Sequence, residues 1–511
     1  MTSRAVWGIL GAVLAVAWLC PQPVAADGDE AGLQFAVYPS TQKIFPDMTP
    51  DGATKAELAG ARGEYVAFQV ALRSESERTL AVGTDLPDIE IFEALYIETA
   101  GTAEWGYPED SPEYRRPAYP DPLVPVSQVQ FEPGVTTALW VRTRVAGDAE
   151  GTLVLDNEGI PASITAWDFE MPGRRSLQTA VGLGGKGFAE YYGVEQWSEE
   201  YWDIYADYYE TLLDYRLTAY RVPYGLQDER GREYLQDERV TTFMMDYYGE
   251  RERMRALCAD LTELGVHNKA YFYNIDEPET AEEFEVARGQ VAYLREVCPE
   301  FRYLLPFFTG LEDQSTPFDH LADVIDVWGI QTDYYHHGHT LGDRIQEQAR
   351  ERWEEGDEIW LYTALAPRGG WCNILLNHTA LEHRLLFWQI FAEEVASGYL
   401  FWQSTYWDQV DDPWTDQATV KRLDPALWGD GSLFYPGDDG PVPSLRLELI
   451  REGLQDYELL RMAEEAAGRE AVMELVGQVT ENFTDYTDDP AEFARVRSAV
   501  AELLIKARNQ E

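Results

Sequence analysis

Lysine is scarce in this 511-residue chain, and positive charge as a whole is in the minority. There are only six Lys, and the 40 Lys and Arg together face 91 Asp and Glu, which gives a formal net charge of −51. Nucleic acids and anionic membrane surfaces bind through basic patches, so neither is expected as a partner. A lysine-poor, carboxylate-rich surface fits work in concentrated salt, where charges are screened within roughly 3 Å at 1 M. The alternative is acidity that serves solubility alone.

Cysteine and long apolar runs are sparse as well. Four Cys in a chain of this length exclude a disulfide scaffold, and their irregular spacing matches no metal-binding motif. After the first 26 residues no apolar run reaches the roughly 18 residues that a membrane span needs. We therefore expect no membrane span. We also expect Cys258, Cys298 and Cys372 to be buried thiols, with a single disulfide as the alternative.

The N-terminus, by contrast, has the pattern of a signal peptide. Arg4 precedes an apolar run over residues 5–19, and residues 24–26 (VAA) form a small-residue cleavage pattern. We expect residues 1–26 to be removed and the mature protein to be secreted or periplasmic. A lipid anchor at Cys20 is the alternative.

The rest of the chain can form large cores, since 45% of all residues are hydrophobic and 13% are aromatic. Residues 27–172 contain short alternating runs separated by Pro, Gly and Asp, which predicts an antiparallel β-sandwich. In residues 173–467 strand-like runs alternate with helical segments, which predicts a (β/α)8 TIM-like barrel. Residues 468–511 are expected to add C-terminal helices. The eight expected barrel strands begin near Thr179, Leu217, Val240, Lys269, Tyr303, Val324, Ile359 and Gly398.

Two adjacent carboxylates close the fourth expected barrel strand. Asp276 and Glu277 follow the aromatic run at residues 271–273 and precede Pro278, which restricts the backbone and favours a turn. Catalytic side chains of such barrels lie where the strands end, at the carboxyl face. The pair is therefore a candidate catalytic site, although Asp-Glu also occurs elsewhere in so acidic a chain and a solvated turn is the alternative.

Adjacent carboxylates suit one variant of glycoside hydrolysis. Most glycosidases pair a proton donor with a second carboxyl group about 5 to 9.5 Å away. Neighbours in sequence fit substrate-assisted catalysis better, in which the 2-acetamido oxygen of the sugar attacks the anomeric carbon. In that scheme Asp276 stays ionised to stabilise the developing charge and Glu277 begins protonated. Two close carboxyl groups resist joint ionisation, which helps Glu277 to keep its proton.

Several segments match a known family in a shared order. They are residues 61–69, 119–125 and 167–172 in the first domain, residues 273–278, 360–363 and 398–402 in the second, and, most specifically, residues 429–437 followed by residues 444–458. With these segments nearly the whole mature chain resembles glycoside hydrolase family 123.

This resemblance implies a β-sandwich followed by a catalytic barrel, and exo-acting β-N-acetylgalactosaminidase activity. By resemblance, Asp276 orients the acetamide and Glu277 is the general acid and base. The expected partner is a glycan with a terminal N-acetylhexosamine, and no cofactor or metal is expected. One rival interpretation is a glycosidase for a non-acetamido sugar, with Asp326 or Asp333 as nucleophile or base. The other is a non-catalytic carbohydrate-binding or surface protein.

Other residues near the expected strand ends are candidates for substrate binding. Aromatic faces can stack on a pyranose and polar tips can bind its hydroxyl groups, although core packing is the alternative for each. These candidates are Tyr273, Gln331, Tyr362, Trp402 and Trp407. The residues 336–339 (HHGH) are expected to form a solvated loop rather than a metal site. Charged residues in one expected helix should tie it to the barrel by ion pairs; they are Arg446, Glu448, Arg451 and Glu452.

Overall fold

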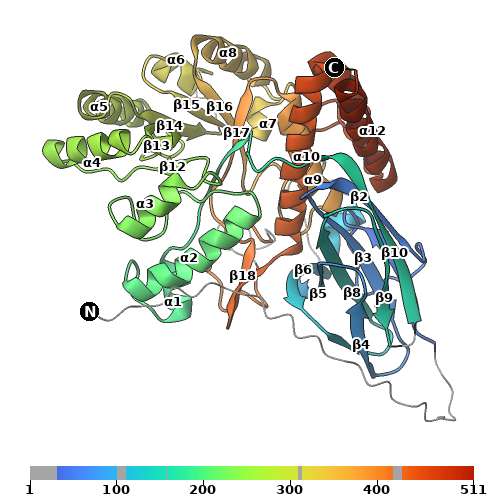
Figure 1. Ribbon diagram of the computed structural model, residues 1–511. Coiled ribbons are helices and arrows are strands. Elements are labelled where there is room, and N and C mark those ends of the chain that lie inside the picture. The colour runs from blue at the N-terminus through green and yellow to red at the C-terminus, as the bar shows by residue number, and fades with distance from the viewer. Residues whose placement is uncertain are drawn as a thin grey trace.

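The computed structural model describes residues 32–99, 107, 111–156, 158–308, 314–417 and 428–510. The expected signal peptide, residues 1–26, lies outside the described residues. A sandwich of two sheets and a barrel-like parallel sheet lie side by side, with long C-terminal helices between and beside them (Figure 1). Among the described helices none is both long and apolar enough to cross a membrane.

The N-terminal domain contains two five-stranded sheets. The first has the order β1(Gln34–Pro39), β3(Tyr65–Arg73), β8(Thr136–Arg144), β5(Ile89–Glu98) and β6(Ala118–Pro125), all antiparallel. The second has the order β2(Ala56–Arg62), β10(Glu158–Glu170), β9(Ala149–Leu155), β4(Arg78–Thr84) and β7(Gln128–Phe131). Among the described strands of this sheet, only β2 and β10 pair in parallel. Alternate residues such as Phe68, Val70 and Leu72 face Leu80, Leu153 and Ile160 in one apolar core between the sheets. The antiparallel sheets predicted for this region are thus present.

The second domain is built on a nearly closed parallel sheet of seven strands. Their order is β11(Gln178–Val181), β17(Ala396–Phe401), β16(Glu358–Thr363), β15(Val327–Gln331), β14(Arg302–Phe307), β13(Ala270–Phe272) and β12(Phe243–Met244). The surrounding helices are α1(Lys186–Tyr192), α2(Glu199–Asp214), α3(Glu229–Gln236), α4(Arg251–Glu263), α5(Ala281–Val297), α6(Pro317–Leu321), α7(Thr332–Tyr335), α8(Gly342–Glu355) and α9(Ala380–Ala392).

The second expected barrel strand, near Leu217, is not a strand in the described structure. This segment makes one parallel bridge, from Ala219 to Val181, and Met244 N donates to the carbonyl of Tyr220 (2.7 Å). Between this segment and β11, threonine side chains take the place of further backbone hydrogen bonds. For example, Thr218 N donates to Thr179 Oγ1 (2.9 Å). The predicted eightfold barrel is therefore replaced by seven strands and a single bridge.

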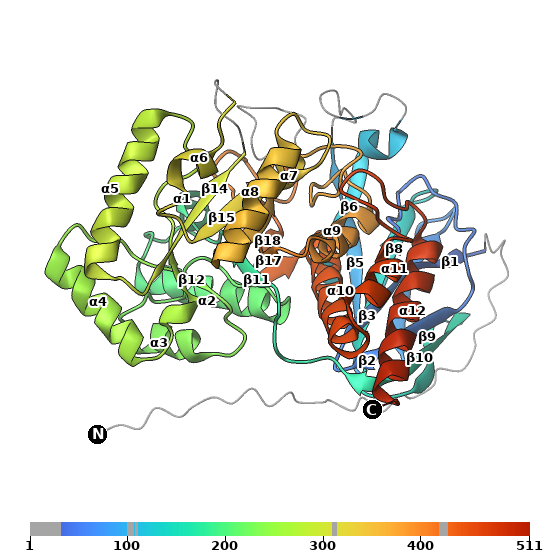
Figure 2. The same cartoon turned by 90° about the horizontal axis from the view of Figure 1, so that it is seen from above.

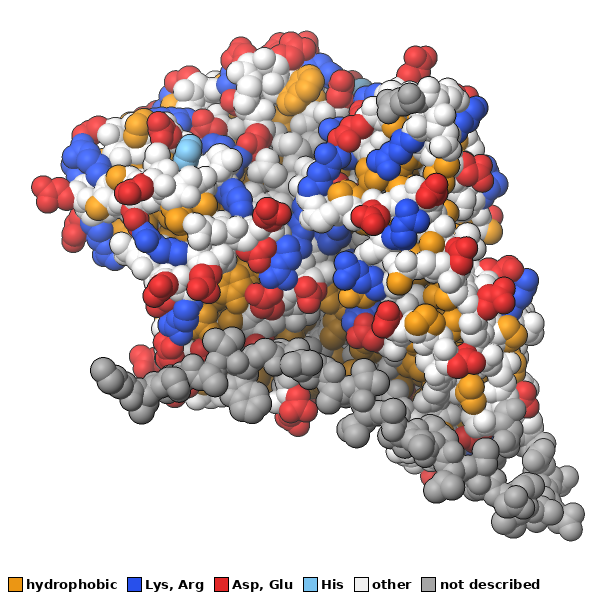
Figure 3. All heavy atoms as spheres, in the orientation of Figure 1, with side chains coloured by type: hydrophobic (Ala, Val, Ile, Leu, Met, Phe, Trp, Pro, Cys, Tyr) orange, Lys and Arg blue, Asp and Glu red, His pale blue; other side chains and the backbone are white. Residues whose placement is uncertain are grey.

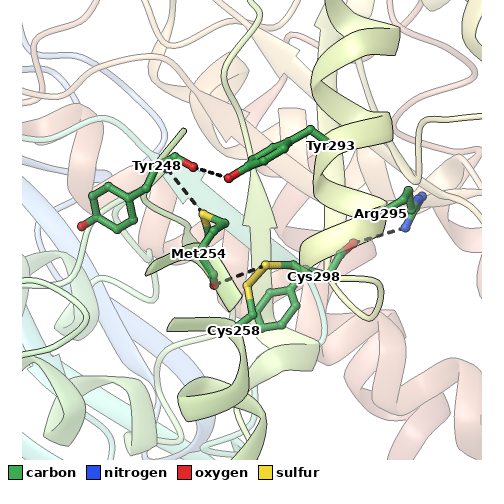
Figure 4. The surroundings of a disulfide bond; sticks show 7 residues. Tyr248, Met254, Cys258, Tyr293, Arg295 and Cys298 are labelled. Carbon is green, nitrogen blue, oxygen red and sulfur yellow. Dashed lines mark hydrogen bonds between the residues drawn. A yellow bond between two sulfur atoms is a disulfide. The ribbon is translucent and has the colours of Figure 1, made fainter. Parts of the chain in front are cut away.

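A disulfide joins two helices on the outside of the barrel. Cys258 of α4 and Cys298, which follows α5, are bonded with their Cα atoms 5.7 Å apart (Figure 4). In the same region the Tyr293 hydroxyl donates to the carbonyl of Tyr248 (2.7 Å). The expectation of three buried thiols is therefore wrong for this pair, since 40 residues separate cysteines that packing of α4 on α5 brings together. Cys372 is buried outside the disulfide.

The long helix α10(Leu445–Ala467) lies between the two domains and contacts α9, β6, α11(Arg469–Val476) and α12(Pro490–Arg508) (Figure 2). The hairpin β18(Phe434–Gly437) and β19(Gly440–Pro443) precedes it. Every residue of α10 from Leu445 to Leu460 is buried, so its charged side chains must pair internally. Arg446 and Glu448 pair with Asp121 and Arg142 of the sandwich, whereas Glu452 pairs with Arg384 of α9. The ion pairs of Arg446 and Glu448 thus tie α10 to the sandwich instead of the barrel, that of Glu452 ties it to the barrel as predicted, and Arg451 pairs with Glu448 within the helix.

Acidic and basic side chains are interspersed over the face drawn in Figure 3. Most of the ion pairs on the surface of the described chain use Arg, for example Arg239 with Glu210 and Asp214. The few basic residues thus neutralise part of the negative surface charge locally.

Candidate active site

The barrel strands end around one cavity of about 750 Å³. Tyr273, Asp276 and Glu277 reach it from the loop after β13, and Gln331 from the end of β15. Tyr362 of β16 and Trp402, directly after β17, complete the group of predicted site residues found there. The other lining residues are Pro306, Phe308, Asp333, Tyr334, Ala364, Leu365, Ala366, Leu400, Tyr406, Gln409 and Asp430.

The two adjacent carboxylates each accept a hydrogen bond from a different tyrosine. The Tyr273 hydroxyl donates to Asp276 Oδ1 (2.5 Å), and the Tyr362 hydroxyl donates to Glu277 Oε1. Glu277 has φ +46°, a left-handed conformation that is rare for a residue with a side chain. Such outliers cost about 1 to 3 kcal/mol and cluster at functional sites. This turn lets neighbouring residues present both carboxyl groups to one cavity, and Tyr273 and Tyr362 hold one each.

The protonation of Glu277 is unusual for a carboxyl group. Burial, helped by the neighbouring charge of Asp276, raises its pKa to about 7, although the hydrogen bond from Tyr362 acts in the opposite direction. A glutamate with a pKa near 7 holds its proton in a large fraction of molecules at neutral pH. It can therefore donate that proton and later accept one, as a general acid and base must.

Two further acids line the same cavity. Burial raises the pKa of Asp333 to about 6, and its Oδ1 atom is buried with no hydrogen-bond partner among the described residues. Burial also raises the pKa of Asp430 to about 6, although Asp430 accepts a hydrogen bond from Trp402 Nε1 (2.9 Å) that acts in the opposite direction. Asp430 was not predicted as a site residue, but it belongs to the segment 429–437 that carries the strongest family resemblance.

Glycine makes room for the indole of Trp402. Gly431 has φ +69°, and a Cβ atom there would lie 2.3 Å from Trp402 Cζ2. Tyr406 also contacts this indole, with ring centroids 4.8 Å apart. Gln331 donates from Nε2 to the carbonyl of Ala366 (3.0 Å), which fixes the loop after β16. Aromatic and polar groups therefore converge in the cavity, as in sites that bind small polar molecules.

Two sequence-based candidates lie elsewhere. Trp407 does not line the cavity: it is 4% exposed and stacks on Phe188 of α1, with ring centroids 5.7 Å apart. Asp326 precedes β15, so it lies at the opposite end of the barrel from the cavity; there it pairs with Arg295 and accepts from Tyr303 N (2.7 Å). Of the two rival nucleophiles only Asp333 is in the cavity.

The histidines of residues 336–339 lie in the loop between α7 and α8. His337 pairs with Asp343, and the ring of His339 packs on that of Tyr334 (4.2 Å between centroids). In the described part of the chain no group of three His, Cys, Asp or Glu side chains is arranged to hold a metal ion.

A cavity at the carboxyl end of a barrel-like sheet, with a neutralisable glutamate beside a second carboxylate, is the arrangement of a glycoside hydrolase. Comparison with known proteins agrees: residues 250–463 match the family model described as the catalytic domain of glycoside hydrolase 123, which confirms the resemblance and supports a glycosidase. None of the curated proteins compared with the chain matches it.

Among solved structures, one of a family 123 glycoside hydrolase from Clostridium perfringens, described for glycolipid glycan hydrolysis, matches with a TM-score of 0.67 at 11% identity. The match covers 94% of this chain and 98% of that one. It shows the same fold over both domains. A family 2 β-galacturonidase from Eisenbergiella tayi matches with a TM-score of only 0.32 at 11% identity, over 76% and 69% of the two chains.

Proposed function

We propose that the protein is an exported, retaining glycoside hydrolase that removes terminal 2-acetamido sugars, with β-N-acetylgalactosaminides as its preferred substrates. The observation that carries the proposal is that Asp276 and Glu277 line one cavity while separate tyrosines hold them. This arrangement supplies one carboxylate for the acetamide and one acid for the glycosidic oxygen.

In the first step the acetamido oxygen attacks the anomeric carbon and the bond to the leaving group breaks. Glu277 donates its proton to the departing oxygen, so that an alcohol leaves. Asp276 accepts a hydrogen bond from the acetamide N–H and stabilises the positive charge of the oxazolinium. Because Tyr273 bonds only Oδ1 in the free protein, Oδ2 is left for this contact.

In the second step water attacks the anomeric carbon from the side that the leaving group vacated. Glu277, now ionised, accepts a proton from that water, and the acetamide is regenerated. Two inversions give overall retention of configuration. Trp402 and Tyr406 offer apolar ring faces to the sugar.

A panel of aryl glycosides tests the proposal. Release is expected from aryl β-N-acetylgalactosaminide, and weaker or no release from the corresponding galactoside and glucoside, which lack the acetamide. An oxazoline mimic should inhibit competitively. Equal turnover of galactoside and N-acetylgalactosaminide would contradict the substrate-assisted route, and no turnover of any member would favour the non-catalytic interpretation.

The pH dependence offers a second test, through Tyr362. Because the acid form of Glu277 is required, kcat/KM should fall as pH rises through about 7. The hydrogen bond from Tyr362 lowers the pKa of Glu277, so Tyr362→Phe should raise that pKa and move the alkaline limb to higher pH. Tyr399→Phe removes a buried hydroxyl that bonds Thr363 outside the cavity, and it should leave the limb unchanged. A shift to lower pH in Tyr362→Phe would contradict this role.

A variant of Asp333 distinguishes the proposed route from its main rival, a glycosidase for a non-acetamido sugar. The place of Asp333 in the cavity, with a pKa raised to about 6 by burial, makes it the candidate nucleophile or base for a non-acetamido sugar. In the substrate-assisted route Asp333→Asn should lower kcat by less than about 10-fold, whereas loss of a nucleophile costs on the order of 10⁴-fold or more. Steady-state rates of the variant on the best aryl glycoside separate the two cases.

Export and salt tolerance are the remaining parts of the proposal. A disulfide between α4 and α5 is typical of an oxidising compartment and supports export. The net charge of −51 supports adaptation to salt, because screening weakens repulsion among the carboxylates. The thermal unfolding midpoint is therefore expected to rise from dilute buffer to about 1 M NaCl. Full stability in dilute buffer, with no gain from salt, would contradict this adaptation.

A further inference from the structure

A second cavity, of about 310 Å³, lies at the same end of the barrel as the catalytic cavity. Three segments of the chain line it: Trp197 and Trp202 come from just before and within the first turns of α2, Arg221 follows the bridge at Ala219, and Asp246 lies just after β12. Its volume is at the lower end of the range for ligand pockets, which suits one small ring.

A tyrosine, Tyr220, lies between the linings of the two cavities. The ring of Tyr220, next to Arg221 in the chain, packs edge-on against Tyr273, with centroids 5.8 Å apart. Tyr273 lines the catalytic cavity, and Met244, which donates its N–H to the carbonyl of Tyr220, lines the second one. The two linings share no residue, but this contact of Tyr220 with Tyr273 places the second cavity beside the first.

Trp197 contributes little buried apolar surface to the stability of the fold. Its side chain is 47% exposed, and its backbone has φ +70°, a left-handed conformation that is strained for a residue with a Cβ atom. Its indole lies against that of Trp202, with centroids 5.2 Å apart and an angle of 38° between the rings. A strained backbone that holds a large aromatic surface at the mouth of a cavity is better explained by a ligand than by the core.

The polar groups of this cavity indicate what kind of ligand it takes. Arg221 Nη1 bonds Asp246 Oδ1 (2.5 Å), and the guanidinium lies over the Trp197 ring, 5.9 Å from its centroid. Planar donors and acceptors beside an indole suit the hydroxyl groups and the apolar C–H face of a pyranose. Because Asp246 compensates the charge of Arg221, the cavity favours a neutral sugar over a uronic or sialic acid.

We infer that this cavity is a second sugar-binding subsite, which holds a neutral pyranose of the glycan on the leaving-group side of the cleaved bond. The inference rests on the proposed function for its place in the reaction. Binding of a neutral sugar at Trp197 is a property that can be measured without hydrolysis.

Trp197→Ala tests the role in hydrolysis, since the exposed side chain can be removed without a core cavity. For a tetrasaccharide with a terminal β-N-acetylgalactosamine on neutral hexoses, kcat/KM should fall about 10-fold, and the fall should be smaller for the aryl monoglycoside, which offers no pyranose to the subsite. Trp353→Ala, at an indole of α8 that is 38% exposed, is the matched control and should change neither. Equal values for Trp197→Ala and wild type on the tetrasaccharide would overturn the inference, and absence of wild-type turnover on every substrate would instead count against the proposed function.

Binding decides the question even without turnover. Tryptophan fluorescence of the full chain is titrated with methyl β-galactoside, methyl β-glucoside and glucuronate. A saturable change with a neutral sugar in wild type and Trp353→Ala, lost in Trp197→Ala and weaker with glucuronate, supports the subsite. No saturable change with either neutral sugar, or one that persists in Trp197→Ala, overturns it.

Discussion

Glu277→Gln is expected to lower kcat on aryl β-N-acetylgalactosaminide by about 10² to 10⁴-fold, the usual contribution of a general acid. Glutamine keeps the size of the side chain, and its amide oxygen can still accept from Tyr362, but it cannot deliver a proton. The loss should be largest for a poor leaving group such as 4-methylumbelliferone and smaller for dinitrophenolate, which departs without protonation. Steady-state rates on the two substrates measure this difference.

Two further variants complete the experiment. Asp276→Asn should cost less than Glu277→Gln but still at least about 10-fold, because in the proposed mechanism this variant loses the carboxylate charge that stabilises the oxazolinium. Glu282→Gln changes an exposed acid of α5 that lies outside the cavity, and it should leave the rate unchanged. A wild-type rate in Glu277→Gln or Asp276→Asn would end the assignment of this pair.

Why could these carboxylates be found in the sequence? The strand before Asp276 ends in a run of aromatic residues, and the carboxyl ends of parallel strands meet at one face. The same rule placed Gln331, Tyr362 and Trp402 around one cavity, because each lies within or next to the last residue of a buried strand. This rule needs only the positions of the strand ends and the parallel direction of the strands, and both can be predicted from the sequence pattern.

For Trp407 the strand-end rule gave a wrong prediction. It lies six residues beyond Phe401, the end of β17, in a loop that returns its side chain to the cluster around Phe188. The path of such a loop depends on contacts between distant segments. The bond between Cys258 and Cys298 depends in the same way on how two helices pack. Asp430 follows no strand and reaches the cavity through a loop that Arg446 holds.

The helix α10 was harder to predict for a different reason. Its apolar residues recur every three or four positions, which is typical of a helix with one exposed face. In the structure Arg446 and Glu448 are on buried faces too, because the sandwich covers the side that the barrel leaves open. The periodicity of apolar residues predicts which face of a helix is buried, but it does not predict that charged residues on the other faces will be buried in ion pairs.

Arg446→Met is therefore expected to cost about 3 to 5 kcal/mol of unfolding free energy, the usual loss when one member of a buried ion pair is removed. The Arg446 and Asp121 side chains are fully buried, and Nε and Nη2 donate to the two oxygens of Asp121 (3.0 and 2.8 Å). The remaining donors bond the carbonyls of Ile374, Gly429 and Ser432. Methionine fills much of the space but leaves Asp121 as a buried charge, whose remaining side-chain partner among the described residues is the Tyr435 hydroxyl.

Arg174→Met is the matched control, because Arg174 pairs with Glu465 of the same helix at the surface, where both side chains are about half exposed. Surface pairs contribute roughly 0 to 1 kcal/mol, so denaturant unfolding should separate the two variants clearly. Arg446→Met should also lower activity at temperatures where it stays folded, since the carbonyl of Gly429 that it releases precedes Asp430 in the cavity wall. Equal stability of the two variants would contradict a role for this pair in holding the sandwich, α10 and the site together.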